Sequence, residues 1–153
     1  MKLAEALNIR ADMQKHVVQL KERIDSNVKV QEGDQPAEQP SLLFTELQEV
    51  LTRLQVLISK INLVNTKTVI DGKTMTEMLA EKDVLKMKLE IFRSAYSNAI
   101  IKCERYSRNE VRYVSAIDCE SLQKKIDTIS KQYRELDLKI QEINWSTEIV
   151  IDW

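Results

Sequence analysis

Residues 118–144 read DCESLQKKIDTISKQYRELDLKIQEIN. Apolar side chains return in this stretch at every third or fourth position, at Leu122, Ile126, Ile129, Tyr133, Leu136, Ile140 and Ile143. This spacing places them along one stripe of a helix. Asp118 can cap the helix, because its carboxylate can accept a hydrogen bond from a backbone N–H of the first turn. The stretch therefore predicts a long amphipathic helix that buries one face.

Three earlier segments carry the same spacing. Together they predict helices at about residues 2–28, 41–66, 75–104 and 119–145. The 153 residues include only two glycines and two prolines, so tight turns are scarce and long regular elements are favoured. We therefore expect a single all-α domain over residues 1–153, folded as an antiparallel bundle of about four long helices.

Other segments break the helical pattern. Residues 31–41 hold both prolines and several acidic side chains and predict an acidic loop, after which Ser41 can cap the second helix. Asp71-Gly72 predicts a tight turn before the third helix. Residues 106–117 are rich in β-branched and aromatic side chains and predict a minor extended or β element. The tail at 147–153 alternates Ile149, Ile151 and Trp153 with Glu148, Val150 and Asp152, which predicts a short edge strand or a helical extension.

Four short motifs occur in an order typical of one protein family: Val30-Gln31-Glu32-Gly33-Asp34, Leu79-Ala80-Glu81-Lys82-Asp83-Val84-Leu85, Arg105-Tyr106-Ser107-Arg108 and Ile143-Asn144-Trp145. By these motifs the chain resembles the septicolysin-like family of small bacterial helical proteins over essentially its whole length. The family name implies a lytic or membrane-active protein, and the resemblance assigns no catalytic or binding residue. Family members tend to carry arginine where this chain has Lys82. Lysine keeps the charge but loses planar bidentate pairing.

Charge and hydropathy exclude several classes of partner. The 23 basic and 24 acidic side chains nearly cancel, so no nucleic-acid partner is expected. No apolar stretch approaches the ~20 residues of a transmembrane helix. The first ten residues lack the apolar core of a signal peptide. We therefore expect a cytoplasmic protein without a transmembrane segment. A membrane role would require rearrangement of the helices or binding at the membrane surface.

Motifs for metal or cofactor chemistry are also missing from the sequence. His16 is the sole histidine, which excludes a two-metal helical site. A zinc site is not expected, because His16, Cys103 and Cys119 lack the spacing of zinc ligands. The pairs Glu46 with Glu49 and Glu77 with Glu81 have magnesium-site spacing, but ion pairing on a solvated helix face is the favoured interpretation. We therefore predict no metal, no cofactor and no catalytic residue.

Two clusters of charged residues are candidate sites. Lys82 interrupts the apolar stripe of the third helix and needs a partner, so Glu81, Lys82 and Asp83 form a candidate buried ion-pair cluster. A second cluster, between the third and fourth helices, could bind an anion or contact another subunit through Arg105, Tyr106, Arg108 and Arg112. Acidic neighbours reduce the charge of this second cluster. Structural pairing of these arginines with the acidic loop or with a neighbouring subunit is therefore the favoured interpretation, and anion binding is the alternative.

The leading interpretation is a non-enzymatic helical protein that forms a homo-oligomer and serves in assembly or interaction. Two alternatives remain open. One is the lytic or membrane-active function that the family resemblance implies. The other is an anion- or nucleotide-dependent enzyme that uses the Arg105–Arg112 segment with carboxylates such as Glu81 and Asp83.

Overall fold

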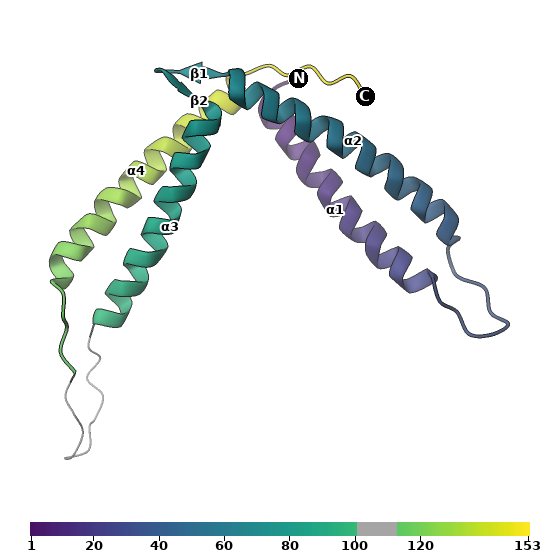
Figure 1. Ribbon diagram of the computed structural model, residues 1–153, viewed down its shortest axis with the longest axis horizontal. Coiled ribbons are helices and arrows are strands. Elements are labelled where there is room, and N and C mark those ends of the chain that lie inside the picture. Colours follow the sequence, from purple (N-terminus) through teal and green to yellow (C-terminus); the bar gives the residue numbers. More distant parts are fainter. Residues whose placement is uncertain (101–112) are drawn as a thin grey trace, which may run out of the picture. The chain divides into compact units, whose positions relative to one another are not determined.

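Long helices dominate the computed structural model, which describes residues 1–100 and 113–153 (Figure 1). They are α1 (Leu3–Asn27), α2 (Pro40–Lys67), α3 (Met75–Ala99) and α4 (Cys119–Ser146). The prediction of an all-α fold with four long helices is confirmed, and the predicted bounds of α1, α2 and α4 agree within one residue at each end. The described part of α3 ends at Ala99, and positions 101–104 of the predicted helix lie outside the described residues.

The N-terminal caps of α4 and α2 differ. At α4, the Asp118 Oδ1 atom accepts a hydrogen bond of 3.1 Å from the Ser121 backbone N–H, which confirms the predicted cap. At α2, the prediction that Ser41 is the cap was wrong, because the helix begins at Pro40 and Gln39 is the cap residue. Proline suits the first helical position, since its φ is already helical and it has no N–H that needs a partner.

A small hairpin joins α2 to α3. Strands β1 (Val69–Ile70) and β2 (Lys73–Thr74) pair antiparallel. Asp71 and Gly72 between them have φ angles of 53° and 79°, as a two-residue type I′ turn requires. The predicted Asp71-Gly72 turn is therefore confirmed. The segment 106–117 was expected to be extended. Its residues 106–112 lie outside the described residues, and residues 113–117 hold no strand.

The chain divides into two compact units, Met1–Met75 with Gln141–Trp153, and Thr76–Ile140. In the first unit, α1 and α2 form a hairpin with an apolar cluster near each of its ends. The larger cluster lies near the start of α1 and the end of α2, and its buried members are Leu3, Ala6, Leu57, Ile61 and Ile149. The smaller cluster lies near the other end of the hairpin, where Leu20 and Ile24 of α1 pack with Leu43 of α2.

The C-terminal tail is held in extended form against the start of α1. The Leu3 N–H donates to the Thr147 carbonyl and the Ile149 N–H donates to the Met1 carbonyl, each at 2.9 Å. Ile149 is 2% exposed and belongs to the larger apolar cluster. The tail thus closes one end of the first unit.

The second unit is a hairpin of α3 and α4. One cluster of its buried core consists of Leu89 from α3 with Ile126 and Ile129 from α4. Half-buried apolar side chains extend this core along both helices, at Leu85, Phe92, Tyr96, Leu122 and Tyr133. These residues belong to the stripes that the sequence predicted for the two helices. None of the helices in the described part of the chain is long and apolar enough to span a membrane.

Candidate functional site

An ion pair joins the two helices of the second unit. The Lys82 ammonium group on α3 donates a hydrogen bond to the Asp137 carboxylate on α4. This hydrogen bond raises the pKa of Lys82 above its ordinary value, although partial burial acts in the opposite direction. The Lys82 ammonium also lies 5.8 Å from the centroid of the Tyr133 ring. Asp137 thus satisfies the charge that interrupts the apolar stripe of α3.

The predicted site residues differ in burial, and some of them lie outside the described residues. Lys82 lies partly buried between the helices, whereas Glu81 and Asp83 are exposed. The carboxylate that accepts the Lys82 hydrogen bond belongs to Asp137, a residue that the sequence did not single out. The candidate anion-binding residues Arg105, Tyr106, Arg108 and Arg112 lie outside the described residues.

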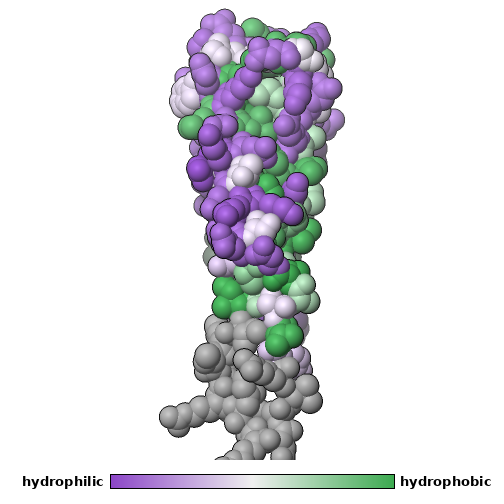
Figure 2. Space-filling model, turned by 90° about the vertical axis from the view of Figure 1, so that its left-hand side faces the viewer, coloured by the Kyte–Doolittle hydropathy of each residue, from purple (hydrophilic) through white to green (hydrophobic). Residues whose placement is uncertain are grey.

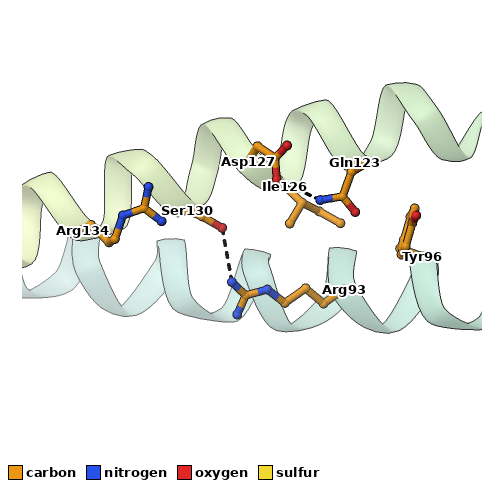
Figure 3. Close-up of a pocket in the computed structure, with 7 residues that line it drawn as sticks. All are labelled: Arg93, Tyr96, Gln123, Ile126, Asp127, Ser130 and Arg134. Carbon is orange, nitrogen blue, oxygen red and sulfur yellow. Dashed lines mark hydrogen bonds between the residues drawn. The ribbon is translucent and has the colours of Figure 1, made fainter.

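A groove of about 480 Å³ runs between α3 and α4 (Figure 3). Its lining comprises two arginines, a tyrosine, three other polar side chains and one buried isoleucine, namely Arg93, Arg134, Tyr96, Gln123, Asp127, Ser130 and Ile126. Figure 3 shows Ser130 between the guanidinium groups of Arg93 and Arg134, whereas Tyr96 lies toward the other end. The groove therefore has a cationic end and an aromatic end.

The charges in this groove are unevenly paired. The Arg93 Nη2 atom donates a hydrogen bond of 3.2 Å to the Ser130 hydroxyl, which is neutral. Asp127 accepts a hydrogen bond of 2.8 Å from the Gln123 amide. Within residues 1–100 and 113–153, no carboxylate lies within ion-pair distance of Arg93 or Arg134. The cationic end thus keeps its capacity to bind an anion.

The outer face of α3 is a second unusual surface. Val84, Met87 and Ile91 are 60%, 57% and 65% exposed. They lie on the side of the helix away from Leu89. Met87 and Ile91, two positions from Leu89, point about 200° around the axis from it, and Val84, five positions away, points about 140° from it. α3 therefore carries an apolar stripe on each of two opposite faces. Figure 2 shows one face of the molecule, where hydrophobic side chains gather beside a band of hydrophilic ones.

A polar cluster in the first unit fixes the loop between α1 and α2. The Arg23 guanidinium donates hydrogen bonds to both carboxylate oxygens of Glu38 and lies 3.8 Å from the Glu46 carboxylate. The hydrogen bond from Arg23 holds the pKa of Glu38 below its ordinary value. The backbone N–H of Glu38 donates to the Asn27 side chain at 2.9 Å, and Asn27 is buried. This cluster satisfies its own charges, so we assign it a structural role.

His16 lies beside this cluster. Its Nε2 atom is 3.1 Å from a carboxylate oxygen of Glu46, and both side chains are partly exposed. Among the residues that the structure describes, no group of three or more His, Cys, Asp or Glu side chains is placed to hold a metal ion.

The sequence signal for the groove between α3 and α4 was weak, because Arg93 and Arg134 belong to no local motif and meet only when α3 pairs with α4.

The fold and these surfaces define an all-α protein of antiparallel helical hairpins with an arginine-lined groove and an exposed apolar helix face. The chain belongs to the DUF6847 family, a family of unknown function, and the match extends over residues 10–149. It is also similar to a functionally unknown conserved protein from Corynebacterium diphtheriae. The crystal structure of that protein shares 39% sequence identity and a TM-score of 0.91 with this chain, covering 98% of this chain and 99% of the other. No curated protein matches the chain.

Proposed function

We propose that this protein is a non-enzymatic assembly protein and that the outer face of α3 binds the same face of a second copy. The exposed stripe of Val84, Met87 and Ile91 is the observation that carries this proposal. Stripes of large apolar side chains are unfavourable in water, and a contiguous stripe on a helix is typical of a helix-pairing surface. The inner face of α3 already packs on α4, so the outer face is free to pair with another molecule.

The outer stripe has the spacing of a short coiled coil. Val84, Ile91 and Asn98 occupy a positions and Met87 occupies the d position between the first two. Branched side chains at a positions favour two strands, and an asparagine at an a position can specify register. The Asn98 amide donates to the Ser94 carbonyl of its own helix, so the apolar part of the stripe is the heptad from Val84 to Ile91. The pattern thus supports a parallel dimer of two α3 helices.

Charges beside the stripe support the same direction. Asp83 occupies a g position and Lys88 an e position, five residues further on. In a parallel pair, a g residue faces the e residue of the next heptad of its partner, so Asp83 of each copy would meet Lys88 of the other. An antiparallel pair would instead bring Asp83 close to Glu90 of the second copy, and these like charges repel.

The expected dimer is weak. Burying the six apolar side chains of the two stripes contributes on the order of 10 kcal/mol. Association itself costs about 4–15 kcal/mol in lost translational and rotational freedom. These opposing terms are of similar size, so self-association should depend strongly on concentration.

Sedimentation velocity over a range of about 5–500 μM tests this proposal, because a weak dimer changes its mean mass within such a range. We expect the mean mass to rise with concentration for the natural chain. Ile91→Glu should keep the mass at that of one chain, because two charges would face each other in the seam. Val18→Glu changes an equally exposed valine on α1 and is the matched control. A natural chain that stays monomeric throughout, or equal behaviour of the two variants, would refute the proposal.

Charge exchange tests the parallel direction. In a parallel dimer of Asp83→Lys, the new lysine of each copy faces Lys88 of the other copy and repels it. In a dimer of Lys88→Asp, the new aspartate of each copy faces Asp83 of the other copy and repels it. We expect each variant alone to associate less than the natural chain at low salt. An equimolar mixture should associate again, because each lysine can then face an aspartate of the other variant. Failure of the mixture to recover would exclude the parallel arrangement.

A membrane-active function is the second candidate, in line with the resemblance to the septicolysin-like family. The same exposed stripe on α3 is the observation that favours it, because an amphipathic helix can insert an apolar face into a lipid surface. Dye release from anionic and neutral liposomes tests this candidate. Release that Ile91→Glu abolishes would support a lytic function, and no release by the natural chain would exclude it.

A further inference from the structure

The groove between α3 and α4 combines features that suit a small ligand with a charged end and a flat end. Its volume of about 480 Å³ falls within the range of about 300–1,000 Å³ that is usual for small-molecule sites. We infer that it binds a nucleoside monophosphate, with the phosphate at Arg93 and Arg134 and the base on Tyr96. This inference is independent of self-association through the outer face of α3.

The arginine end fits a phosphate group. Arg93 comes from α3 and Arg134 from α4, and their guanidinium groups lie on either side of Ser130 (Figure 3). Guanidinium groups form charge-assisted hydrogen bonds with phosphate oxygens, and two of them can bind different oxygens of one phosphate. The Ser130 hydroxyl, which already accepts a hydrogen bond from Arg93, can donate its own proton to a further oxygen.

Arg23 in the first unit shows how an arginine of this chain is paired when carboxylates lie nearby. The Arg23 guanidinium is hydrogen-bonded to Glu38 and lies near Glu46, so carboxylates of the chain itself balance its charge. In the described part of the chain, neither Arg93 nor Arg134 has such a carboxylate. An external anion can supply the negative charge that these two arginines lack.

The other end of the groove fits a planar base. Tyr96 is half-buried and its ring packs against the core of the hairpin, so the ring is held in place as a stacking surface. The buried Ile126 adds an apolar wall. Gln123 and Asp127 offer an amide and a carboxylate that can form hydrogen bonds with the edge of a base. The negative charge of Asp127 would also direct the phosphate toward the arginine end.

Calorimetric titration with the four nucleoside monophosphates tests the inference, with ribose 5-phosphate and inorganic phosphate as probes that lack the base. We expect at least one nucleoside monophosphate to bind about tenfold more tightly than ribose 5-phosphate, because base stacking on Tyr96 is lost in the smaller probe. If no nucleotide binds, or if inorganic phosphate binds as tightly as the nucleotides, the inference is wrong.

Variants of groove residues locate the binding. Arg134→Ala should weaken nucleotide binding about tenfold through loss of charge-assisted hydrogen bonds, and Tyr96→Leu should weaken it similarly while it keeps an apolar side chain against the core. Lys125→Ala removes one positive charge from an exposed position of α4 that lines a different groove, and should leave binding unchanged. An equal loss in Lys125→Ala and Arg134→Ala would show nonspecific attraction and overturn the inference. Ile91→Glu should bind nucleotide as well as the natural chain does.

Discussion

Lys82 and Asp137 form a hydrogen-bonded ion pair across the α3–α4 hairpin, although 55 positions separate them in the sequence. Their side chains are 22% and 35% exposed, so the pair is shielded from water only in part. Removal of one partner leaves the other charge poorly solvated, although the cost is smaller than for a fully buried pair because water still reaches both groups. The pair also lies at the edge of the apolar contact between the helices, next to Tyr133.

We expect Asp137→Asn to lower the free energy of unfolding by about 1–2 kcal/mol, because Lys82 then loses its charge-assisted hydrogen bond. The double variant Lys82→Met with Asp137→Leu should recover most of this loss, since neither charge remains. Urea unfolding followed by circular dichroism measures both effects. Lys86→Met, at an exposed lysine one turn further along α3, is the control. If the double variant lost as much as the two single changes added together, the ion pair would not be coupled.

Acid should weaken the contact between Arg23 and Glu38. The pKa of Glu38 in the folded protein lies below its ordinary value of 4.5, chiefly because Arg23 donates hydrogen bonds to the carboxylate. A lowered carboxyl pKa gives a stabilisation that is present above the unfolded value and is lost as the pH falls through the folded value. The natural chain should therefore unfold at higher urea than Glu38→Gln near neutral pH, and the difference should shrink as the pH falls below the ordinary carboxyl value of 4.5 and through the lower folded value.

A second acidic residue of the same loop provides the control for this pH dependence. Glu32→Gln removes the same charge from an exposed position. It should shift the urea midpoint much less than Glu38→Gln does at neutral pH. A difference between the natural chain and Glu38→Gln that persisted unchanged at low pH would contradict the assigned contact.

The turn between β1 and β2 depends on a backbone conformation that few residues adopt. Gly72 has a φ of 79°, and a Cβ atom at this position would meet nothing within 4 Å, so a substitution there meets backbone strain alone. Gly72→Ala should lower the unfolding free energy by about 1 kcal/mol, a shift of about 2–4 °C in Tm. Gly72→Asn should cost less, because asparagine tolerates positive φ. Thermal unfolding distinguishes them, and equal melting temperatures would contradict the explanation.

Local signals in the sequence predicted much of the fold. The 3/4 spacing in α4, the carboxylate of Asp118 and the Asp71-Gly72 dipeptide each act within a few residues, so their structural effects could be inferred without knowledge of the tertiary contacts. Ser41 failed as a cap for an equally local reason. Pro40 had already started the helix one residue earlier.

The sites were harder to predict because they depend on how helices pair. Asp137 becomes the partner of Lys82, and Arg134 joins Arg93 in one groove, only when α3 lies against α4. Nothing near either residue in the sequence marks that relationship. The spacing predicted the stripe of α3 that packs against α4, with Lys82 as its one charged interruption. It did not single out the exposed stripe of Val84, Met87 and Ile91 on the outer face.

α3 has apolar side chains on two opposite faces, so either face could in principle pack against α4 during folding. The face toward α4 carries Leu85, Leu89, Phe92 and Tyr96, whereas the outer face carries only Val84, Met87 and Ile91. A half-turn of α3 about its own axis would therefore bury less apolar surface against α4, and it would also carry Lys82 away from Asp137. Apolar burial and the ion pair thus favour the same rotational orientation of α3.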